Sequence, residues 1–367
     1  MSTYSLSLLA FLSLILTTTA TTIGVTYISS PDLPPPEHVI NLFQSLKITA
    51  VRLPVPNPSI IRAFSYTNIS LFISIPNSLI PAIAGNRSAA DTWLYNHVIP
   101  YYPRAHITAI SVGNHVLSQG NVTYANLLIP AIRNVQSSLT DIGIRQIIVS
   151  TTFSFINIMA TSFPPSSAQF QDPVSRFLIK PLLDLLKETN SSFFVSLYPY
   201  NMYKRRPEIP LGFALFQESS YSFRDDAVTG VRYRNLFDLM VDSVIAAMAV
   251  AGHENIPLIV TETGWPSYDS TNEVEGRQFY AEMYLRGLVN HIKCGNGTAL
   301  WKEGLKEVYI YETFDTNDTV GIVQNWGFCY PNMSMKFRID FSNGGDRHMR
   351  FYYFSILTFL MIDFFDK

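Results

Sequence analysis

The chain has 367 residues, of which 47% are hydrophobic and 15% charged, and its formal net charge at pH 7 is −2. This composition supports a large core and excludes intrinsic disorder. With no excess of basic residues, the chain has no overall positive field to attract the phosphate backbone of a nucleic acid, which argues against a nucleic-acid partner. Two cysteines, Cys294 and Cys329, are too few for a disulfide scaffold or a cysteine-rich zinc site, and their pairing stays open.

The first 20 residues predict a secretory signal peptide. An apolar run over residues 6–16 is followed by Thr18 and Ala20 at the −3 and −1 positions of a cleavage site. The run is too short for a membrane-spanning helix. Asn-x-Ser/Thr sequons also indicate export into a compartment that glycosylates proteins. They occur at Asn68, Asn86, Asn121, Asn190, Asn296, Asn317 and Asn332.

The last segment, residues 342–367, predicts a divergent hydrophobic tail. Small residues at 342–345 precede a spacer and the apolar run 351–362, which is the outline of a lipid-anchor signal. The spacer is short, however, and the chain ends in the charged stretch 363–367. A terminal helix packed on the domain is the alternative, and a truncated or frame-altered gene product of little function is a further one.

Residues 22–341 contain no low-complexity linker and predict one domain. Short β-branched or aromatic runs alternate there with helix-like segments, which is typical of a parallel sheet covered on both faces. Eight such runs favour an α/β fold of the (β/α)8 TIM barrel type. A doubly wound open sheet is less favoured because its Gly-rich first turn is absent. The predicted strands are residues 23–27, 50–53, 71–76, 107–113, 146–153, 193–200, 258–263 and 308–314, with helices at 37–46, 124–139, 235–251 and 273–289.

Barrels of this type carry their chemistry where the strands end. Glu262 is the one acidic residue in the predicted strand 258–263, and Gly264, Trp265 and Pro266 follow that strand. A buried carboxylate is costly unless it faces a polar opening or a cation. We therefore predict that Glu262 points into the barrel mouth beside the indole, a pairing suited to a sugar ring. A structural ion pair with Arg52 is the alternative.

The string VTETGWPS at residues 260–267 resembles the nucleophile motif of family 17 glycoside hydrolases, the plant endo-β-1,3-glucanases. Further similar strings follow the family's order over residues 23–341. The resemblance implies a (β/α)8 fold and retaining hydrolysis of internal β-1,3-glucan bonds, with Glu262 as nucleophile. It also implies no metal or organic cofactor and a secreted, cell-wall location, and we expect a monomer. The similar strings include residues 51–53, 112–114, 198–200 and 325–327.

The sequence differs from the family at the position of the catalytic acid/base. The family's acid/base glutamate directly follows Val-Gly-Asn, and this chain has His115 there. Retaining hydrolysis uses two carboxyl groups about 5–5.5 Å apart. An imidazolium can donate a proton, and we expect nearby Glu262 to raise its pKa. Its charge beside a developing oxocarbenium ion costs roughly 3 kcal/mol, so we predict weak or absent turnover.

Other family positions are also changed, which favours a glucan-binding pseudoenzyme as the alternative function. Pro54 and Val55 replace Tyr-Asp, Ser196 replaces an asparagine, and Thr316 and Thr319 stand where the family has Glu and Lys. Glu312 is a candidate replacement proton donor, or a structural partner for Lys306. The residues expected to bind sugar are Tyr27, Asn114, Tyr198, Trp265, Asp315 and Trp326.

Overall fold

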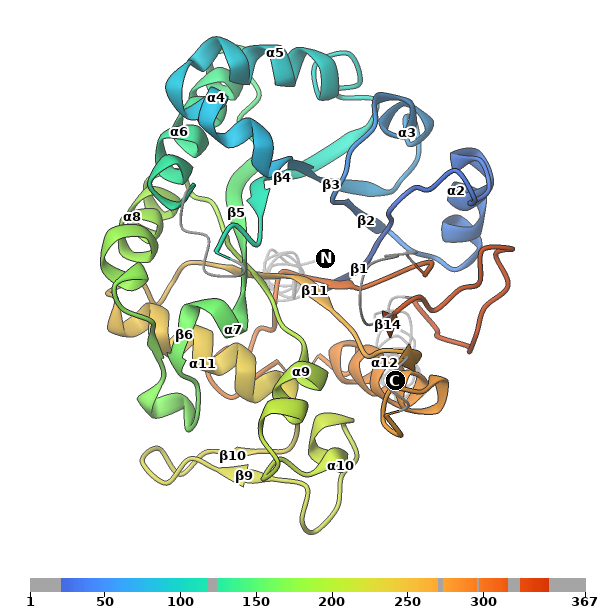
Figure 1. Ribbon diagram of the computed structural model, residues 1–367, viewed down its shortest axis with the longest axis vertical. Coiled ribbons are helices and arrows are strands. Elements are labelled where there is room, and N and C mark those ends of the chain that lie inside the picture. Colours follow the sequence, from blue (N-terminus) through green and yellow to red (C-terminus); the bar gives the residue numbers. More distant parts are fainter. Residues whose placement is uncertain (1–20, 118–123, 270–272, 296, 316–323, 343–367) are drawn as a thin grey trace, which may run out of the picture.

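Parallel strands form a closed barrel in the order β1-β13-β11-β8-β5-β4-β3-β2, with helices arranged around it (Figure 1). The computed structural model describes residues 21–117, 124–269, 273–295, 297–315 and 324–342. The predicted signal peptide and nearly all of the predicted tail lie outside these residues. The predicted TIM barrel is confirmed. The barrel strands are β1 (Thr22–Thr26), β2 (Ala50–Leu53), β3 (Ser70–Ile75), β4 (His106–Asn114), β5 (Ile148–Ser154), β8 (Phe193–Ser196), β11 (Leu258–Thr263) and β13 (Glu307–Ile310).

Helices, three small antiparallel strand pairs and connecting loops make up the rest of the described chain. The strand pairs are β6 (Met159–Thr161) with β7 (Gln169–Phe170), β9 (Arg224–Asp225) with β10 (Arg232–Tyr233), and β12 (Tyr268–Asp269) with β14 (Gln324–Asn325). The helices are α2 (Pro36–Ser45), α3 (Pro58–Ala63), α4 (Ile80–Gly85), α5 (Arg87–His97), α6 (Ala125–Asp141), α7 (Phe155–Ile158), α8 (Lys180–Glu188), α9 (Pro199–Arg205), α10 (Leu211–Ala214), α11 (Leu236–Val250) and α12 (Gln278–Lys293). No helix in this described part is long and apolar enough to cross a membrane.

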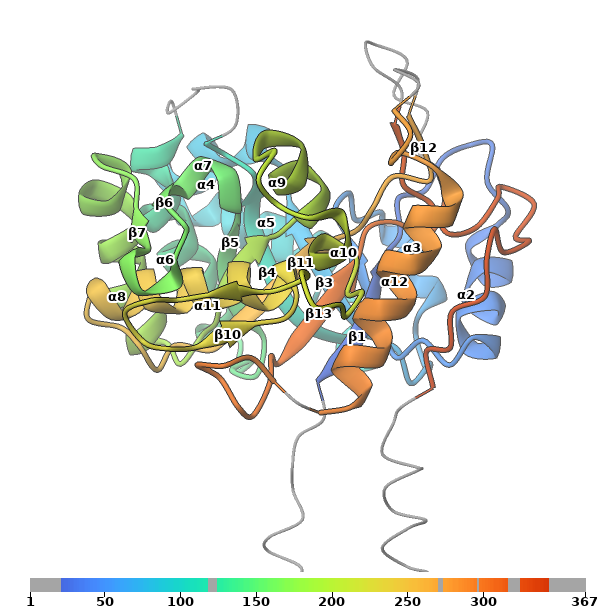
Figure 2. The same cartoon turned by 90° about the horizontal axis from the view of Figure 1, so that it is seen from below.

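Local chemistry sets the helix starts and shortens two predicted strands. Asn235 caps α11 by accepting a hydrogen bond from the Asp238 amide. Strand β8 ends at Ser196, short of the predicted residue 200, because Pro199 lacks an amide donor and begins α9. Strand β13 likewise ends at Ile310, before the predicted residue 314. Both strands therefore give way to loops at the end of the barrel where α9 and β12 lie (Figure 2).

The barrel interior is filled by side chains from most of the barrel strands, and a larger apolar layer separates the strands from the helices. The interior cluster contains Ala50, Phe72, Ala109, Phe194, Ile259 and Tyr309. This packing closes the lower barrel and leaves polar side chains at the strand ends to form a site. Outside the barrel, Cys294 is exposed and Cys329 is buried, and both thiols are free. The two described cysteines therefore do not pair.

A buried carboxylate on α11 makes the fold's stability depend on pH. Burial raises the pKa of Asp242 to about 6 from 3.8, although the Tyr233 hydroxyl and the Leu300 amide donate to its Oδ2. Because the folded-state pKa is raised, this group stabilises the fold at low pH, and that contribution, about 3 kcal/mol, is lost as pH rises through about 6. As pH rises from 3.8 to about 6, we expect the thermal unfolding temperature to fall less in Asp242→Asn than in the unaltered chain. An unchanged pH slope relative to the exposed control Asp141→Asn would contradict the assignment.

Candidate active site

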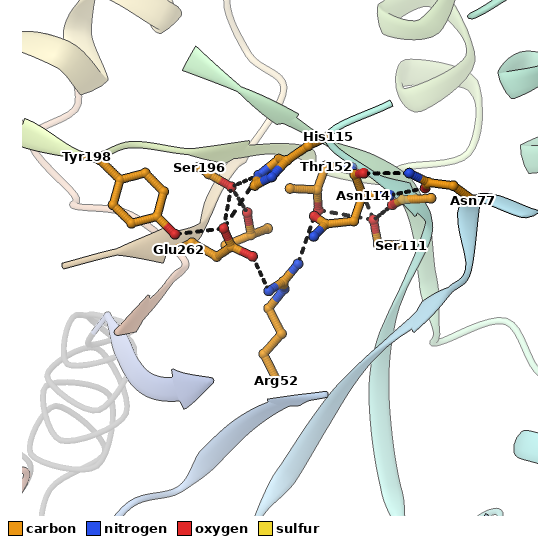
Figure 3. A network of polar contacts seen from close by, with 11 residues as sticks. Arg52, Asn77, Ser111, Asn114, His115, Thr152, Ser196, Tyr198 and Glu262 are labelled. Carbon is orange, nitrogen blue, oxygen red and sulfur yellow. Dashed lines mark hydrogen bonds and ion pairs between the residues drawn. The ribbon is translucent and has the colours of Figure 1, made fainter. Parts of the chain in front are cut away.

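Side chains from four barrel strands meet at the carboxyl ends of those strands (Figure 3). Glu262 comes from β11, Arg52 from β2 and Asn114 from β4, while His115 directly follows β4. Tyr198 lies two residues beyond β8 and begins the turn into α9. Because the strands of the closed barrel are parallel, their last residues lie at one rim of it. The sequence positions that carry the motifs are thus brought together.

Glu262 is held by donors on both of its carboxylate oxygens. Arg52 Nη1 lies 2.5 Å from Oε1, and the Tyr198 hydroxyl donates to Oε2 at 2.8 Å. Arg52 Nη2 also donates to Asn114 Oδ1 at 3.0 Å. The side chain of Arg52 is fully buried, so this cation is poorly screened and fixes the carboxylate in place. The ion pair expected as the structural alternative is therefore present, and it orients Glu262 within the site.

The ionised form of Glu262 is favoured. Burial alone would raise its pKa, but the charge of Arg52, the charge that His115 carries when it is protonated and the hydrogen bond from Tyr198 outweigh burial and leave the pKa below its ordinary value. Conversely, burial and the neighbouring Glu262 charge hold the pKa of Tyr198 well above 10.0. The carboxylate is thus ready to act as an anion, and the phenol keeps its proton for donation.

His115 is turned toward Glu262 by an unusual stretch of backbone. Gly113 has φ +78°, and a side chain there would come within 2.8 Å of Ile80 and Val116. His115 itself is left-handed, with φ 50°. Its Nε2 lies 2.6 Å from Ser196 Oγ and 3.4 Å from Glu262 Oε2. The imidazole therefore sits directly against the carboxylate, closer than the separation that a retaining pair of carboxyl groups keeps.

The imidazole of His115 favours its neutral form, contrary to the expectation that Glu262 would raise its pKa. Only 26% of the His115 side chain is exposed. Burial lowers its pKa below 6.5; Glu262 opposes this shift, and Arg52 adds to it. The expectation from the sequence included only the effect of the Glu262 carboxylate. It did not include burial of the imidazole or the charge of Arg52. A neutral imidazole is a poor proton donor for a sugar leaving group.

An open cavity of about 300 Å³ lies above these groups. Four of its lining residues were predicted site residues with direct access to it, namely His115, Asn114, Tyr198 and Glu262. Trp326, a fifth, contacts Tyr198 edge to face, with ring centroids 5.2 Å apart. The other lining residues were not predicted to bind sugar, although Pro54 was noted as a changed family position. Three of them directly follow predicted strands, and Tyr311 lies within one. These other lining residues are Ile28, Pro54, Asn201 and Tyr311.

Comparison with known proteins places this barrel and its carboxylate in a family. A family model described as glycosyl hydrolases family 17 matches residues 23–341. The chain belongs to family 17 of the glycosyl hydrolases. It is 37% identical to glucan endo-1,3-beta-glucosidase 13 of Arabidopsis thaliana over 331 residues, which cover 88% of this chain and 65% of that protein. The solved structure of CJP38, a β-1,3-glucanase and allergen of Cryptomeria japonica pollen, matches with a TM-score of 0.82 at 32% identity, covering 88% of this chain and 99% of that one.

A second relative covers more of its own length. The family 17 chain is 35% identical over 328 residues to glucan endo-1,3-beta-glucosidase of Vitis vinifera, covering 88% of this chain and 92% of that protein. The chain thus spans just under two thirds of the Arabidopsis relative and nearly all of the grapevine one. The shared part is the barrel that carries the cavity.

Trp265 does not line the cavity of this family 17 chain, so its prediction as a sugar-binding residue is wrong. Its side chain is 0% exposed and packs on Tyr200 and Tyr284. Its Nε1 donates to the Glu275 carbonyl at 2.7 Å. The chain turns at Gly264 and carries the indole behind the strand ends, because burying a large aromatic surface there stabilises the loop.

Tyr27 and Asp315 also lie away from the cavity. Tyr27 is buried, with its ring edge to face against Phe43 and Phe314. Both carboxylate oxygens of Asp315 accept from Lys336 Nζ at 2.7 Å, and Oδ1 also accepts from the Gly327 amide. Their prediction as sugar-binding residues is corrected: Tyr27 packs in the core, and Asp315 anchors the segment that carries Trp326.

The replacement proton donor considered at Glu312 is not supported by its position. Glu312 is buried, with 1% of its surface exposed. It is not among the residues that line the cavity. A carboxyl group outside the cavity cannot reach a leaving group bound inside it. Thr316 and Thr319 lie outside the described residues.

Proposed function

We propose that this chain binds β-1,3-glucan in the cavity and cuts its internal bonds slowly by the retaining mechanism. Glu262 acts as the nucleophile, and His115 occupies the acid/base position. The observation that supports this most strongly is the placement of the Glu262 carboxylate, held between Arg52 and Tyr198 and open to the cavity. The names of the Arabidopsis and grapevine relatives concern the same bond, a 1,3-β-glucosidic one.

The limiting step follows from the charges. Attack by Glu262 on the anomeric carbon breaks the bond to the leaving sugar, whose oxygen needs a proton. His115 supplies it only when its imidazole is protonated, and its pKa is below 6.5. Nε2 is also engaged with Ser196 Oγ at 2.6 Å. Bond cleavage is therefore slow even though the nucleophile is intact.

Binding without turnover is the second candidate function, favoured by the contact between His115 and Ser196. The test of both is the release of reducing ends from a soluble β-1,3-glucan at about pH 5–6, below the ordinary pKa of histidine. We expect slow release above the background of a Glu262→Ala sample, together with saturable glucan binding. Saturable binding with release equal to that background would favour the binding function. Absence of both would contradict the proposal.

Trp326 is proposed as a sugar platform at the cavity wall. It packs edge to face on Tyr198, Tyr200 and Tyr311, which holds its ring in one orientation. We expect Trp326→Ala to weaken glucan binding about tenfold, because stacking on an aromatic ring is lost. The exposed Tyr95 on α5 provides a matched control, Tyr95→Ala. Equal affinities of the two variants in a titration with a soluble glucan would rule this role out.

We also propose that the mature chain is a secreted glycoprotein of the cell wall. The sequons at Asn68, Asn86, Asn190 and Asn332 all lie at exposed positions, where a transferred glycan has room. The remaining three lie outside the described residues. A surface covered with glycans is consistent with the low content of charged residues. The signal peptide over residues 1–20 and the anchor signal in the tail remain predictions, as does the monomeric state.

A further inference from the structure

Among the described residues that line the cavity, Glu262 is the only carboxylate. The rest of this wall is apolar, amide, phenol, indole or imidazole. When Glu262 forms a covalent bond to a sugar, its negative charge is consumed in the ester. The guanidinium of Arg52, which lies 2.5 Å from Oε1 in the free site, then has no anion to balance it. The covalent intermediate therefore has a positive rather than a negative environment.

This charge pattern differs from that of an ordinary retaining site. There the second carboxyl group has given up its proton in the first step and faces the intermediate as an anion. An anionic group at that place repels other anions and leaves water as the acceptor. At the same place this chain has His115, which is neutral after giving up a proton. The feature that excludes anions is missing.

Hydrogen-bond donors line the cavity that an incoming anion would enter. The Tyr198 hydroxyl donates to Glu262 Oε2 at 2.8 Å in the free site. Once the ester forms, this acceptor no longer carries a negative charge. Asn114 accepts a hydrogen bond from Arg52 through its Oδ1 atom. The Nδ2 atom of the same amide is therefore the one that can donate a hydrogen bond to an anion. Asn201 and Tyr311 add an amide and a phenol to the cavity wall.

We propose that the glycosyl-enzyme formed on Glu262 is opened by inorganic phosphate, so that the chain transfers β-1,3-glucan units to phosphate. This inference rests on the proposed nucleophilic role of Glu262. It adds a second substrate, an oxyanion, and a second product, a β-glycosyl phosphate. Hydrolysis is then the side reaction of a site whose acceptor is an anion.

The two steps balance as follows. In the first, Glu262 forms a bond to the anomeric carbon, the glycosidic bond breaks, and the leaving oxygen takes the proton of the His115 imidazolium. In the second, an oxygen of dihydrogen phosphate bonds to the anomeric carbon and the ester bond to Glu262 breaks. The imidazole takes one phosphate proton and is again an imidazolium. The sum is glucan plus dihydrogen phosphate giving glycosyl phosphate monoanion plus the shortened glucan.

The surroundings of His115 suit this proton exchange. Glu262 from β11 and Arg52 from β2 are the charged groups that act on it. The Ser196 hydroxyl, on β8, lies against Nε2, and Tyr198 follows on the same side. With Glu262 esterified, only the Arg52 cation remains, which favours the neutral imidazole as proton acceptor. Phosphate also carries its own negative charge and needs less help from a base than water does.

The experiment uses an aryl β-laminaribioside with a dinitrophenolate leaving group, which departs without a proton. The purified chain is incubated with it in phosphate, or in sodium chloride of equal ionic strength, and the products are followed by phosphorus NMR. We expect dinitrophenolate release in both salts, with β-glycosyl phosphate as the main product in phosphate. Dinitrophenolate release with sugar hydrolysis alone would overturn the inference and keep the nucleophile. Release equal to that of Glu262→Ala would overturn the proposed function itself.

Two variants distinguish the effect of a negative charge at position 115 from the effect of losing the imidazole ring. Once Glu262 is esterified, its charge no longer keeps the carboxyl group of His115→Glu protonated. That group then ionises and places an anion at the acceptor site, and we expect it to lower the yield of glycosyl phosphate roughly a hundredfold through repulsion. His115→Gln removes the titratable ring and stays neutral, so with the activated substrate it should still form glycosyl phosphate. A His115→Glu variant that forms as much glycosyl phosphate as His115→Gln would contradict the electrostatic basis of the proposal.

Discussion

Replacing His115 by glutamate is expected to raise the hydrolysis of β-1,3-glucan about a hundredfold, the factor that roughly 3 kcal/mol of barrier represents. A carboxylic acid is neutral before it donates its proton, so it does not oppose the positive charge that develops on the sugar. Burial and the proximity of Glu262 would raise its pKa and keep it protonated at about pH 5–6. Reducing-end release from a soluble glucan measures the gain.

His115→Gln is the matched control, because it fills similar space and cannot donate a proton to a leaving sugar. We expect it to hydrolyse glucan no faster than the unaltered chain. If His115→Glu folds, binds glucan and still shows no gain, then the barrier lies elsewhere. The altered positions Pro54 and Ser196, which border the site, would then be the first to restore.

Replacing Glu262 is expected to abolish covalent chemistry at the site. A 2-deoxy-2-fluoro laminaribioside with a dinitrophenolate leaving group transfers its sugar to the nucleophile without needing an acid, and the fluorine slows release of the ester. We expect one added sugar mass on the peptide that contains Glu262, and none in Glu262→Gln. The loss should be at least a thousandfold in labelling rate, because the amide is a far weaker nucleophile.

The glutamine variant keeps the volume of the side chain and a partner for Arg52, so the fold should persist. An alanine there would leave the buried Arg52 cation unpaired, which costs several kcal/mol. Thermal unfolding of Glu262→Gln close to that of the unaltered chain confirms that the comparison is fair. Labelling of a different carboxylate, such as Glu312, would show that the nucleophile has been misassigned.

The barrel could be predicted because parallel strands covered on both faces have a distinctive composition. The eight predicted runs match the eight barrel strands, with the largest errors at the ends of β8 and β13. There the predicted runs continue over residues 197–200 and 311–314, whose aromatic residues are typical of strands. Apolar composition alone does not show where a strand leaves the barrel, and only Pro199 marked one of these ends.

The site was predicted less evenly, for a geometric reason. His115, Asn114, Tyr198 and Glu262 follow or end strands and point into the cavity. Trp265 follows a strand equally closely and is fully buried. Successive residues of a strand point to opposite faces, and a turn after the strand removes even that regularity. The position of a residue along the chain therefore predicts whether it lies at the rim of the barrel. The direction of its side chain can be known only from the folded structure.

The charge of His115 could not be predicted from its neighbours in sequence. Glu262 is the neighbour that a motif comparison supplies, and alone it would raise the pKa. Arg52, which is 63 positions away along the chain from His115, is brought into the same site by the barrel and acts in the opposite direction. Enclosure by the neighbouring loops adds the largest effect. Both opposing contributions exist only in the folded chain.

The measurement that tests the central claim most directly is the pKa of His115, followed by NMR of its ring in the folded chain as pH is changed. His115→Gln identifies the signal by removing it. A neutral imidazole at the proton-donor position predicts a pKa below 6.5, because burial and Arg52 outweigh Glu262. A pKa above that value would mean that the chain has a charged, competent acid at this position. Slow hydrolysis would then have to be explained by another part of the site.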